Sequence, residues 1–128
     1  MKLLLDTNIL LKAAADILPK GAQEYILEES NELYFSSASI WEVVTKRGLN
    51  RPDFEADPHL LHTALLSNGY TAIPITAAHT LLTGTLPMIH KDPFDRILIA
   101  QSISEGISLL TTDEKIAEYP APVIFVRK

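Results

Sequence analysis

The stretch HKDPFDRILIAQ, residues 90–101, decides the fold. Asp92 can cap a helix, and Pro93 suits the first helical position because its missing N–H would have no partner there. The apolar residues that follow predict a helix that is largely buried. Asp95 shares one stripe of this helix with Asp92 and Ile99. Because an unpaired buried charge is costly, we expect Asp95 to face a group that balances its charge.

Elsewhere the chain alternates short apolar runs with helical patterns. Strands are predicted at residues 2–5, 33–35, 70–75, 107–111 and 123–126. Helices are predicted at residues 7–15, 19–29, 37–48, 57–69, 76–84 and 92–106, with a polar connector at 51–55 and a short helix or turn at 114–119. Because strands alternate with helices and are continuously apolar, we expect an α/β fold with a five-stranded, mainly parallel sheet, flanked by helices on both faces.

Length and composition limit the class of protein. The 128 residues, 47% hydrophobic and 21% charged, suffice for one domain over residues 1–128. No apolar run reaches the ~18 residues of a membrane span, and the N-terminus lacks a signal-peptide pattern. Without cysteine there is no disulfide or thiolate metal site, so a cytoplasmic location is expected. The net charge of −5 argues against a protein that coats nucleic acid, but not against an enzyme with a local basic rim.

Four acidic residues are predicted to meet at one edge of the sheet. Asp6 ends the first strand and Asp113 ends the fourth, while Glu42 and Asp95 lie near the starts of helices. Strand ends and the starts of helices share the edge where α/β sheets bind ligands. Such a cluster of carboxylates needs a cation, and oxygen ligands favour Mg²⁺ or Mn²⁺. This chemistry suits a phosphodiesterase or nuclease, and no Ser-His-Asp set, P-loop or Gly-x-Gly-x-x-Gly motif is present.

Each acid also has a structural interpretation. Asp6, Asp92 and Asp113 are all placed to cap a helix, and Asp95 could pair with a neighbouring Arg. Glu42 would form a solvated i,i+4 ion pair with Lys46. The convergence of several acids on one edge favours the functional interpretation of the set.

The basic, aromatic and histidine residues say less about the functional site than the acids do. Basic residues cluster around the end of the helix predicted at 37–48, at Lys46, Arg47 and Arg51, and two more, Lys91 and Arg96, flank Asp95. Each is a solvated side chain by itself, but as a group they could hold a phosphate backbone. The aromatic residues Tyr34, Phe35 and Trp41 are interpreted as core, His59 and His62 as a solvated pair, and His79 as structural, while His90 could face the cleft.

The same motifs resemble the PIN-domain ribonucleases, specifically the VapC-type toxins of toxin–antitoxin pairs. The resemblance covers essentially the whole chain and rests on LLDTN at 4–8, SIWEV at 39–43, the 90–101 stretch and LTTD at 110–113. By this resemblance the acidic metal-site positions are Asp6, Glu42, Asp95 and Asp113, and the supporting hydroxyl belongs to Thr111 or Thr112.

The resemblance implies a single PIN domain with a three-layer sandwich, which cleaves RNA endonucleolytically with Mg²⁺ or Mn²⁺. It also implies a homodimer and a VapB-like antitoxin that blocks the active site. Asp6 and Asp95 would be the main metal ligands, Asp113 would add direct or water-mediated coordination, and Glu42 would orient or deprotonate the attacking water. Asp92 competes with Asp95 for the metal role, and we expect Asp95 to hold it.

Two alternatives remain open. A receiver-type phosphoacceptor domain also gathers Asp residues and Mg²⁺ at the edge of a parallel sheet, but it would want an Asp at the end of the third strand, where Ile75 and Thr76 stand. A non-catalytic binding module with a PIN-like fold would show no metal-dependent activity and would tolerate loss of Glu42.

Overall fold

The alternation of strands and helices in the sequence is reproduced in space. The computed structural model describes the backbone of residues 1–128 and every side chain except that of Asp53. The strands are β1 (Lys2–Leu5), β2 (Glu32–Ser36), β3 (Thr71–Ile73), β4 (Ser108–Thr111) and β5 (Val123–Phe125). The helices are α1 (Thr7–Ala14), α2 (Lys20–Leu27), α3 (Ser37–Gly48), α4 (Pro58–Ser67), α5 (Ala77–Thr83), α6 (Pro93–Glu105) and α7 (Glu114–Ala117), with a 3₁₀ turn, η1 (Pro52–Phe54).

The strands form one sheet in the order β3-β2-β1-β4-β5, and every neighbouring pair is parallel. The expected five-stranded parallel α/β sheet is therefore confirmed. Receiver domains have the order 2-1-3-4-5 instead. The receiver-type alternative does not fit this topology.

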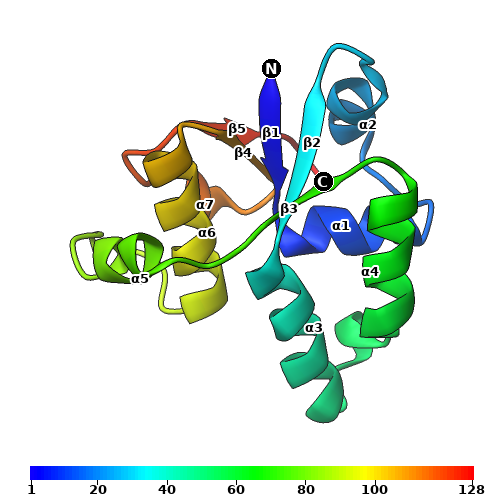
Figure 1. Cartoon of the computed structure of the whole chain (residues 1–128), viewed down its shortest axis with the longest axis horizontal. Coiled ribbons are helices and arrows are strands. Elements are labelled where there is room, and N and C mark those ends of the chain that lie inside the picture. Colours follow the sequence, from blue (N-terminus) through cyan, green and yellow to red (C-terminus); the bar gives the residue numbers. More distant parts are fainter.

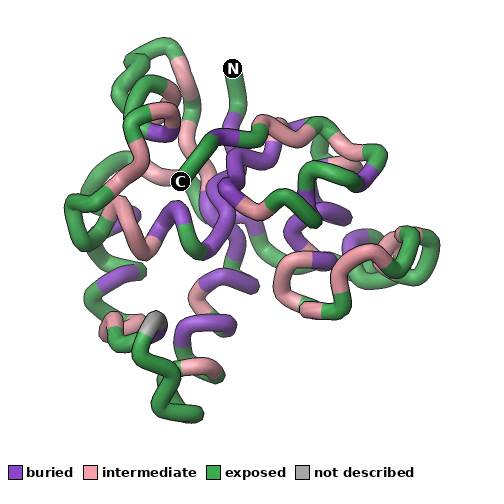
Figure 2. Tube along the Cα trace, turned by 180° about the vertical axis from the view of Figure 1, so that it is seen from behind, coloured by how far each residue is buried: buried purple, intermediate pink, exposed green. Residues whose placement is uncertain are grey.

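Side chains of β1 alternate between two cores on opposite faces of the sheet. Leu3 and Leu5 pack with residues of α1, α2, α3 and α4, whereas Leu4 packs with residues of α6 and α7. Figure 1 shows α6 and α7 on one side of β1 and α1 on the other. Figure 2 shows the buried residues gathered in the central strands and on the inner sides of the helices. Both faces are covered, which explains why β1 is continuously apolar.

The 90–101 stretch forms the helix that it predicts. The Asp92 side chain accepts a hydrogen bond from the Phe94 N–H, and Pro93 opens α6. The helix ends at Gly106, whose φ of 66° lies in the left-handed region that glycine adopts at little cost. Its inner face carries Leu98 and Ile99, which are fully buried.

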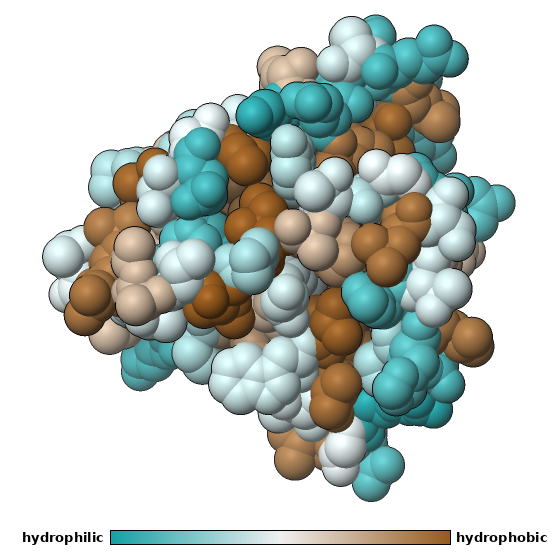
Figure 3. Space-filling view, in the orientation of Figure 1, coloured by the Kyte–Doolittle hydropathy of each residue, from teal (hydrophilic) through white to brown (hydrophobic). Residues whose placement is uncertain are grey.

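One core prediction is wrong. Phe35 is buried, but Trp41 is 61% exposed and packs edge-to-face on Phe94 with the ring centroids 5.0 Å apart. Trp41 lies one residue before Glu42, so turning Glu42 inward turns the indole outward on the helix. Figure 3 shows apolar side chains scattered among polar ones on one face of the molecule. Among the described residues, no helix combines the length and apolarity needed to cross a membrane.

Candidate active site

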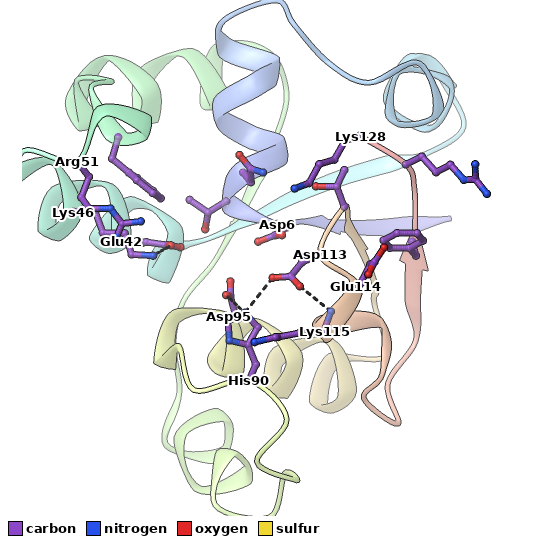
Figure 4. Close-up of a pocket in the computed structure, with 16 residues that line it drawn as sticks. Asp6, Glu42, Lys46, Arg51, His90, Asp95, Asp113, Glu114, Lys115 and Lys128 are labelled. Carbon is purple, nitrogen blue, oxygen red and sulfur yellow. Dashed lines mark hydrogen bonds and ion pairs between the residues drawn. The ribbon is translucent and has the colours of Figure 1, made fainter.

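A cavity of about 1020 Å³ opens at the edge where the parallel strands end. Asp6 follows β1, Asp113 follows β4, Glu42 lies on α3 and Asp95 lies in the first turn of α6. All of them line this cavity, and Figure 4 shows their carboxylates pointing into the same space. The structure therefore brings together the acids that topology assigned to one edge.

Asp6 is held by a hydroxyl from the neighbouring strand. Its side chain is buried, and Thr111 Oγ1 donates a 2.7 Å hydrogen bond to Asp6 Oδ2. The same hydroxyl accepts a hydrogen bond from the Asp113 N–H at 3.0 Å. Thr111, rather than Thr112, is thus the supporting hydroxyl, and it fixes Asp6 as well as the backbone of Asp113. The Asp6 side chain does not cap α1, so the capping interpretation of this residue is wrong.

Glu42 faces the cavity from the second turn of α3. Behind it, Thr7 Oγ1 donates to Ser39 Oγ at 2.8 Å and joins the starts of α1 and α3. The ion pair between Glu42 and Lys46 exists, but it is not solvated, since Glu42 is only 3% exposed. Glu42 Oε1 is buried and finds no hydrogen-bond partner among the described residues. A buried carboxylate oxygen without a partner indicates that a water or an ion binds there.

Lys46 joins Glu42 to Asp92. Its Nζ lies 2.5 Å from Glu42 Oε2 and 2.9 Å from Asp92 Oδ2. Asp92 uses its other oxygen to cap α6. Both oxygens of Asp92 are therefore engaged, and Asp92 does not line the cavity. These contacts favour Asp95 over Asp92 as a metal ligand.

His90 lines the cavity, as the sequence allowed, although it was not among the predicted site residues. Its Nε2 lies 2.9 Å from Asp95 Oδ2 and 3.1 Å from Asp113 Oδ2. Its Nδ1 accepts a hydrogen bond from the Asp92 N–H at 3.2 Å. His90 precedes the start of α6, where no helical periodicity fixes its direction. Its place two residues before the capping Asp92 was the one available signal.

The site carries more negative charge than its protein neighbours neutralise. Burial, together with the nearby carboxylates of Asp6 and Asp92, raises the pKa of Asp95 from 3.8 to about 8. Burial likewise raises the pKa of Asp6 to about 6, against the opposing effect of the Thr111 hydrogen bond.

Lys46 has the opposite effect on the pKa of Asp92, a carboxylate to which it donates a hydrogen bond. Burial disfavours the charged form of Asp92, but the hydrogen bonds from Lys46 and from the Phe94 N–H, together with the charge of Lys46, outweigh burial and lower the pKa of Asp92. Burial also disfavours the charged form of Lys46, and its hydrogen bonds to Glu42 and Asp92 raise the pKa of Lys46 nonetheless. The pKa values of Asp6 and Asp95 are raised instead, because burial and neighbouring acids disfavour their charged forms. An oxygen-rich set of this kind, with Glu42 Oε1 unpartnered beside it, fits a hard divalent cation.

The predicted nucleic-acid contacts need correction. Arg96 is buried, and its guanidinium donates to Thr83 O at 2.8 Å and to Pro87 O at 2.9 Å, so it cannot reach a phosphate. Arg47 pairs with Asp57 outside the cavity, and Lys91 is exposed but does not line it. The basic residues that line the cavity are Lys46, Arg51, Lys115, Arg127 and Lys128.

The remaining histidines agree with their structural interpretation. His79 is buried and closes a capping box at the start of α5, where its Nδ1 accepts from the Thr76 N–H at 3.0 Å. Its Nε2 lies 3.1 Å from Glu105 Oε2. His59 and His62 lie exposed on α4, away from the acids of the cavity.

Comparison with known proteins shows which fold this chain has. A family model described as "PIN domain" matches residues 3–122. The chain resembles VapBC2 from Rickettsia felis bound to a promoter DNA fragment, with a TM-score of 0.71 and 20% identity over 99% of this chain and 98% of that one. It also resembles DNA-bound VapBC from Salmonella typhimurium (TM-score 0.68, 17% identity) and VapBC-1 from nontypeable Haemophilus influenzae (TM-score 0.65, 18% identity), each over 98% of both chains.

At these identities, the solved structures share the fold with this chain. A comparison with curated proteins found no match. The matched region takes in Asp6, Glu42, Asp95 and Asp113, together with the strands and helices that carry them. Because this family model spans nearly the whole chain, the chain belongs to the PIN domain family.

Proposed function

We propose that this protein is an endoribonuclease that depends on Mg²⁺ or Mn²⁺ and acts as the toxin of a toxin–antitoxin pair. The observation that carries the proposal is the convergence of Asp6, Glu42, Asp95 and Asp113 on one cavity. Membership in the PIN domain family supports a nuclease, and the raised pKa values of Asp6 and Asp95 support a cation as the missing partner.

The residues that would hold the ion are Asp6, Asp95 and Asp113. They come from the end of β1, the start of α6 and the end of β4. When bound, a divalent cation lowers the pKa of water and stabilises charge that develops on a phosphoryl group. Thr111 keeps Asp6 in place by donating to its Oδ2, which leaves the orientation of this carboxylate independent of the ion.

Glu42 is proposed to orient the attacking water or accept its proton. Lys46 holds Glu42 Oε2, so Oε1 is the oxygen left for water. A carboxylate fixed in this way is placed for general-base work on a water that attacks the phosphorus of the RNA backbone in line with the leaving oxygen. The proton would reside on Oε1 until it passes to solvent.

The RNA backbone is proposed to approach over the basic residues of the cavity rim. Lys115, Arg127 and Lys128 line the cavity from the side of β5 and α7, as Figure 4 shows for Lys115 and Lys128. They supply positive charge near an acidic centre in a protein whose net charge is −5. Lys46 lies in the cavity itself, and Arg47 and Lys91 would meet only RNA that extends beyond it.

A VapB-like antitoxin and a second copy of this chain are the proposed protein partners. The similar solved structures are named as VapBC complexes, from Rickettsia felis, Salmonella typhimurium and Haemophilus influenzae. Their fold matches this chain over nearly its whole length. This similarity supports an equivalent pair here.

Cleavage of RNA by the purified protein, free of antitoxin, tests the function. Mixed-sequence RNA should be cut with Mg²⁺ or Mn²⁺ and remain intact in chelator. Glu42→Gln, which keeps the size of the side chain, should lose the activity. Intact RNA under every condition, or full activity of Glu42→Gln, would instead support a non-catalytic module or another arrangement of the chemistry.

A further inference from the structure

We infer that His90 is a positioning residue, whose Nε2–H holds the carboxylates of Asp95 and Asp113 together, and that it does not bind the metal itself. The inference rests on the proposed metal-dependent function. It gives a role to a residue for which the sequence indicated only that it could face the cleft, and it follows from the hydrogen bonds around the imidazole ring.

The hydrogen bond at Nδ1 fixes where the proton of the ring lies. The backbone N–H of Asp92 points at His90 Nδ1 from 3.2 Å, and a backbone N–H can only donate. Nδ1 must therefore present its lone pair, and the ring proton is on Nε2. The Nε2–H then faces Asp95 Oδ2 at 2.9 Å and Asp113 Oδ2 at 3.1 Å, both of which can accept it.

This shared proton joins two separate elements. Asp95 belongs to the first turn of α6, and Asp113 follows β4. Asp113 Oδ1 accepts from the Lys115 N–H at 2.8 Å, so the two contacts fix both of its oxygens. Without a donor between them, two carboxyl groups at this distance from one nitrogen would repel each other and turn apart once both are ionised, which is the form that binds a cation. His90 keeps them ready for a cation.

The backbone of His90 is clamped as well. Its N–H donates to the Tyr119 hydroxyl at 2.7 Å, and this hydroxyl lies 3.3 Å from His90 O. Arg96 Nη1 donates to the same hydroxyl at 3.2 Å. The hydroxyl thus accepts two hydrogen bonds and gives its proton to His90 O. Arg96 and Tyr119 are both buried, which makes this clamp part of the folded core.

The competing assignment is a metal site formed by His90, Asp95 and Asp113. One ligand atom of each lies within 4.8 Å of the other two. For His90 Nε2 to bind an ion, its proton would have to move to Nδ1, and the Asp92 N–H would then face another N–H. The two assignments differ in a measurable way, because only one places nitrogen on the ion.

Binding of Mn²⁺ to the whole protein separates them. Pulsed electron paramagnetic resonance of the wild type with Mn²⁺ should show no directly bound ¹⁴N. Calorimetry should show that His90→Leu, which keeps bulk but has no donor, weakens Mn²⁺ binding by about 10- to 100-fold. His90→Gln, whose amide can donate from nearly the place of Nε2, should recover most of this loss. His59→Leu, at an exposed histidine outside the cavity, should bind as the wild type does.

Tyr119→Phe gives a further test, since it removes the clamp and leaves the His90 ring. A loss of Mn²⁺ affinity smaller than that of His90→Leu is expected, and circular dichroism would confirm that each variant is folded. A bound ¹⁴N in the wild type, or unchanged affinity in His90→Leu, would overturn the positioning role while the metal centre stands. Absence of Mn²⁺ binding to the wild type would instead overturn the proposed function on which this inference rests.

Discussion

Lys46 Nζ lies 2.5 Å from Glu42 Oε2, whereas Glu42 Oε1 is buried without a partner among the described residues. Lys46 therefore neutralises one oxygen of Glu42 and leaves the other oxygen without a partner. The same ammonium reaches Asp92 at the start of α6, so a single lysine on α3 fixes the relation between two helices that bear site residues.

Lys46→Met should destabilise the metal-free protein by roughly 1–3 kcal/mol, because Glu42 and Asp92 then face each other without a cation. Urea denaturation in chelator measures this loss. Arg47→Met, on the same helix, is the control. Its pair with Asp57 at 3.9 Å is about half exposed, so a loss below about 1 kcal/mol is expected. Equal stability of Lys46→Met and the wild type would mean that this ion pair does not contribute to the free energy of unfolding.

Asp6→Asn and Asp95→Asn should each reduce cleavage by about 100-fold or more, since each removes a charge that holds the ion. In chelator both variants should be at least as stable as the wild type, because an amide relieves the repulsion between buried carboxylates. In Asp6→Asn, the oxygen of the new amide could still accept the hydrogen bond from Thr111. Thermal melts in chelator check the second part, and a large loss of stability would show that the acid is structural.

The stability of the metal-free protein should fall as the pH rises from about 4 to about 8. In this window the folded state keeps a proton on Asp95, whose pKa is about 8, whereas the unfolded chain has released it at about 3.8. Asp6 adds to the slope up to about pH 6. Melting temperatures in chelator between pH 5 and 9 should show this decline, and Asp95→Asn should flatten it. A slope that is unchanged in Asp95→Asn would contradict the assignment.

Arg96→Met should destabilise the fold by about 2–4 kcal/mol, because carbonyl groups of the 83–90 segment lose the buried guanidinium that donates to them. Lys91→Met, five residues earlier and exposed, should change stability by less than about 0.5 kcal/mol. Urea denaturation of the two variants compares them directly. A stable Arg96→Met that only binds RNA less tightly would restore the sequence-based interpretation of Arg96.

Lys115→Ala and Arg127→Ala should raise the KM for RNA and leave kcat nearly unchanged. Each phosphate contact that is lost should reduce the slope of log affinity against log salt by about 0.7 for single-stranded RNA. Lys20→Ala, exposed on α2 and outside the cavity, is the control. Salt titrations of RNA binding in Ca²⁺ provide the measurement, and identical slopes in all proteins would exclude this rim as the RNA path.

The acids of the site could be predicted from the sequence, because the order of strands and helices alone assigns them to one edge of the sheet. Asp6 and Asp113 end apolar runs, and parallel strands bring such ends to one edge of the sheet. The direction of single side chains was harder to predict. Arg96 follows Asp95 on the same helix, yet it turns toward the 83–90 segment, whose carbonyl groups are brought near only by the folded chain. His90 lies in that segment, where no periodicity indicates a direction.

Calorimetric titration of Mn²⁺ into the wild type, Asp6→Asn and Asp95→Asn tests the central claim most directly. Asp6 and Asp95 come from opposite parts of the sequence and meet only in the fold. If their carboxylates share one ion, the wild type should bind Mn²⁺ and both variants should lose most of that affinity. Mn²⁺ binding that persists undiminished in either variant would contradict a shared centre.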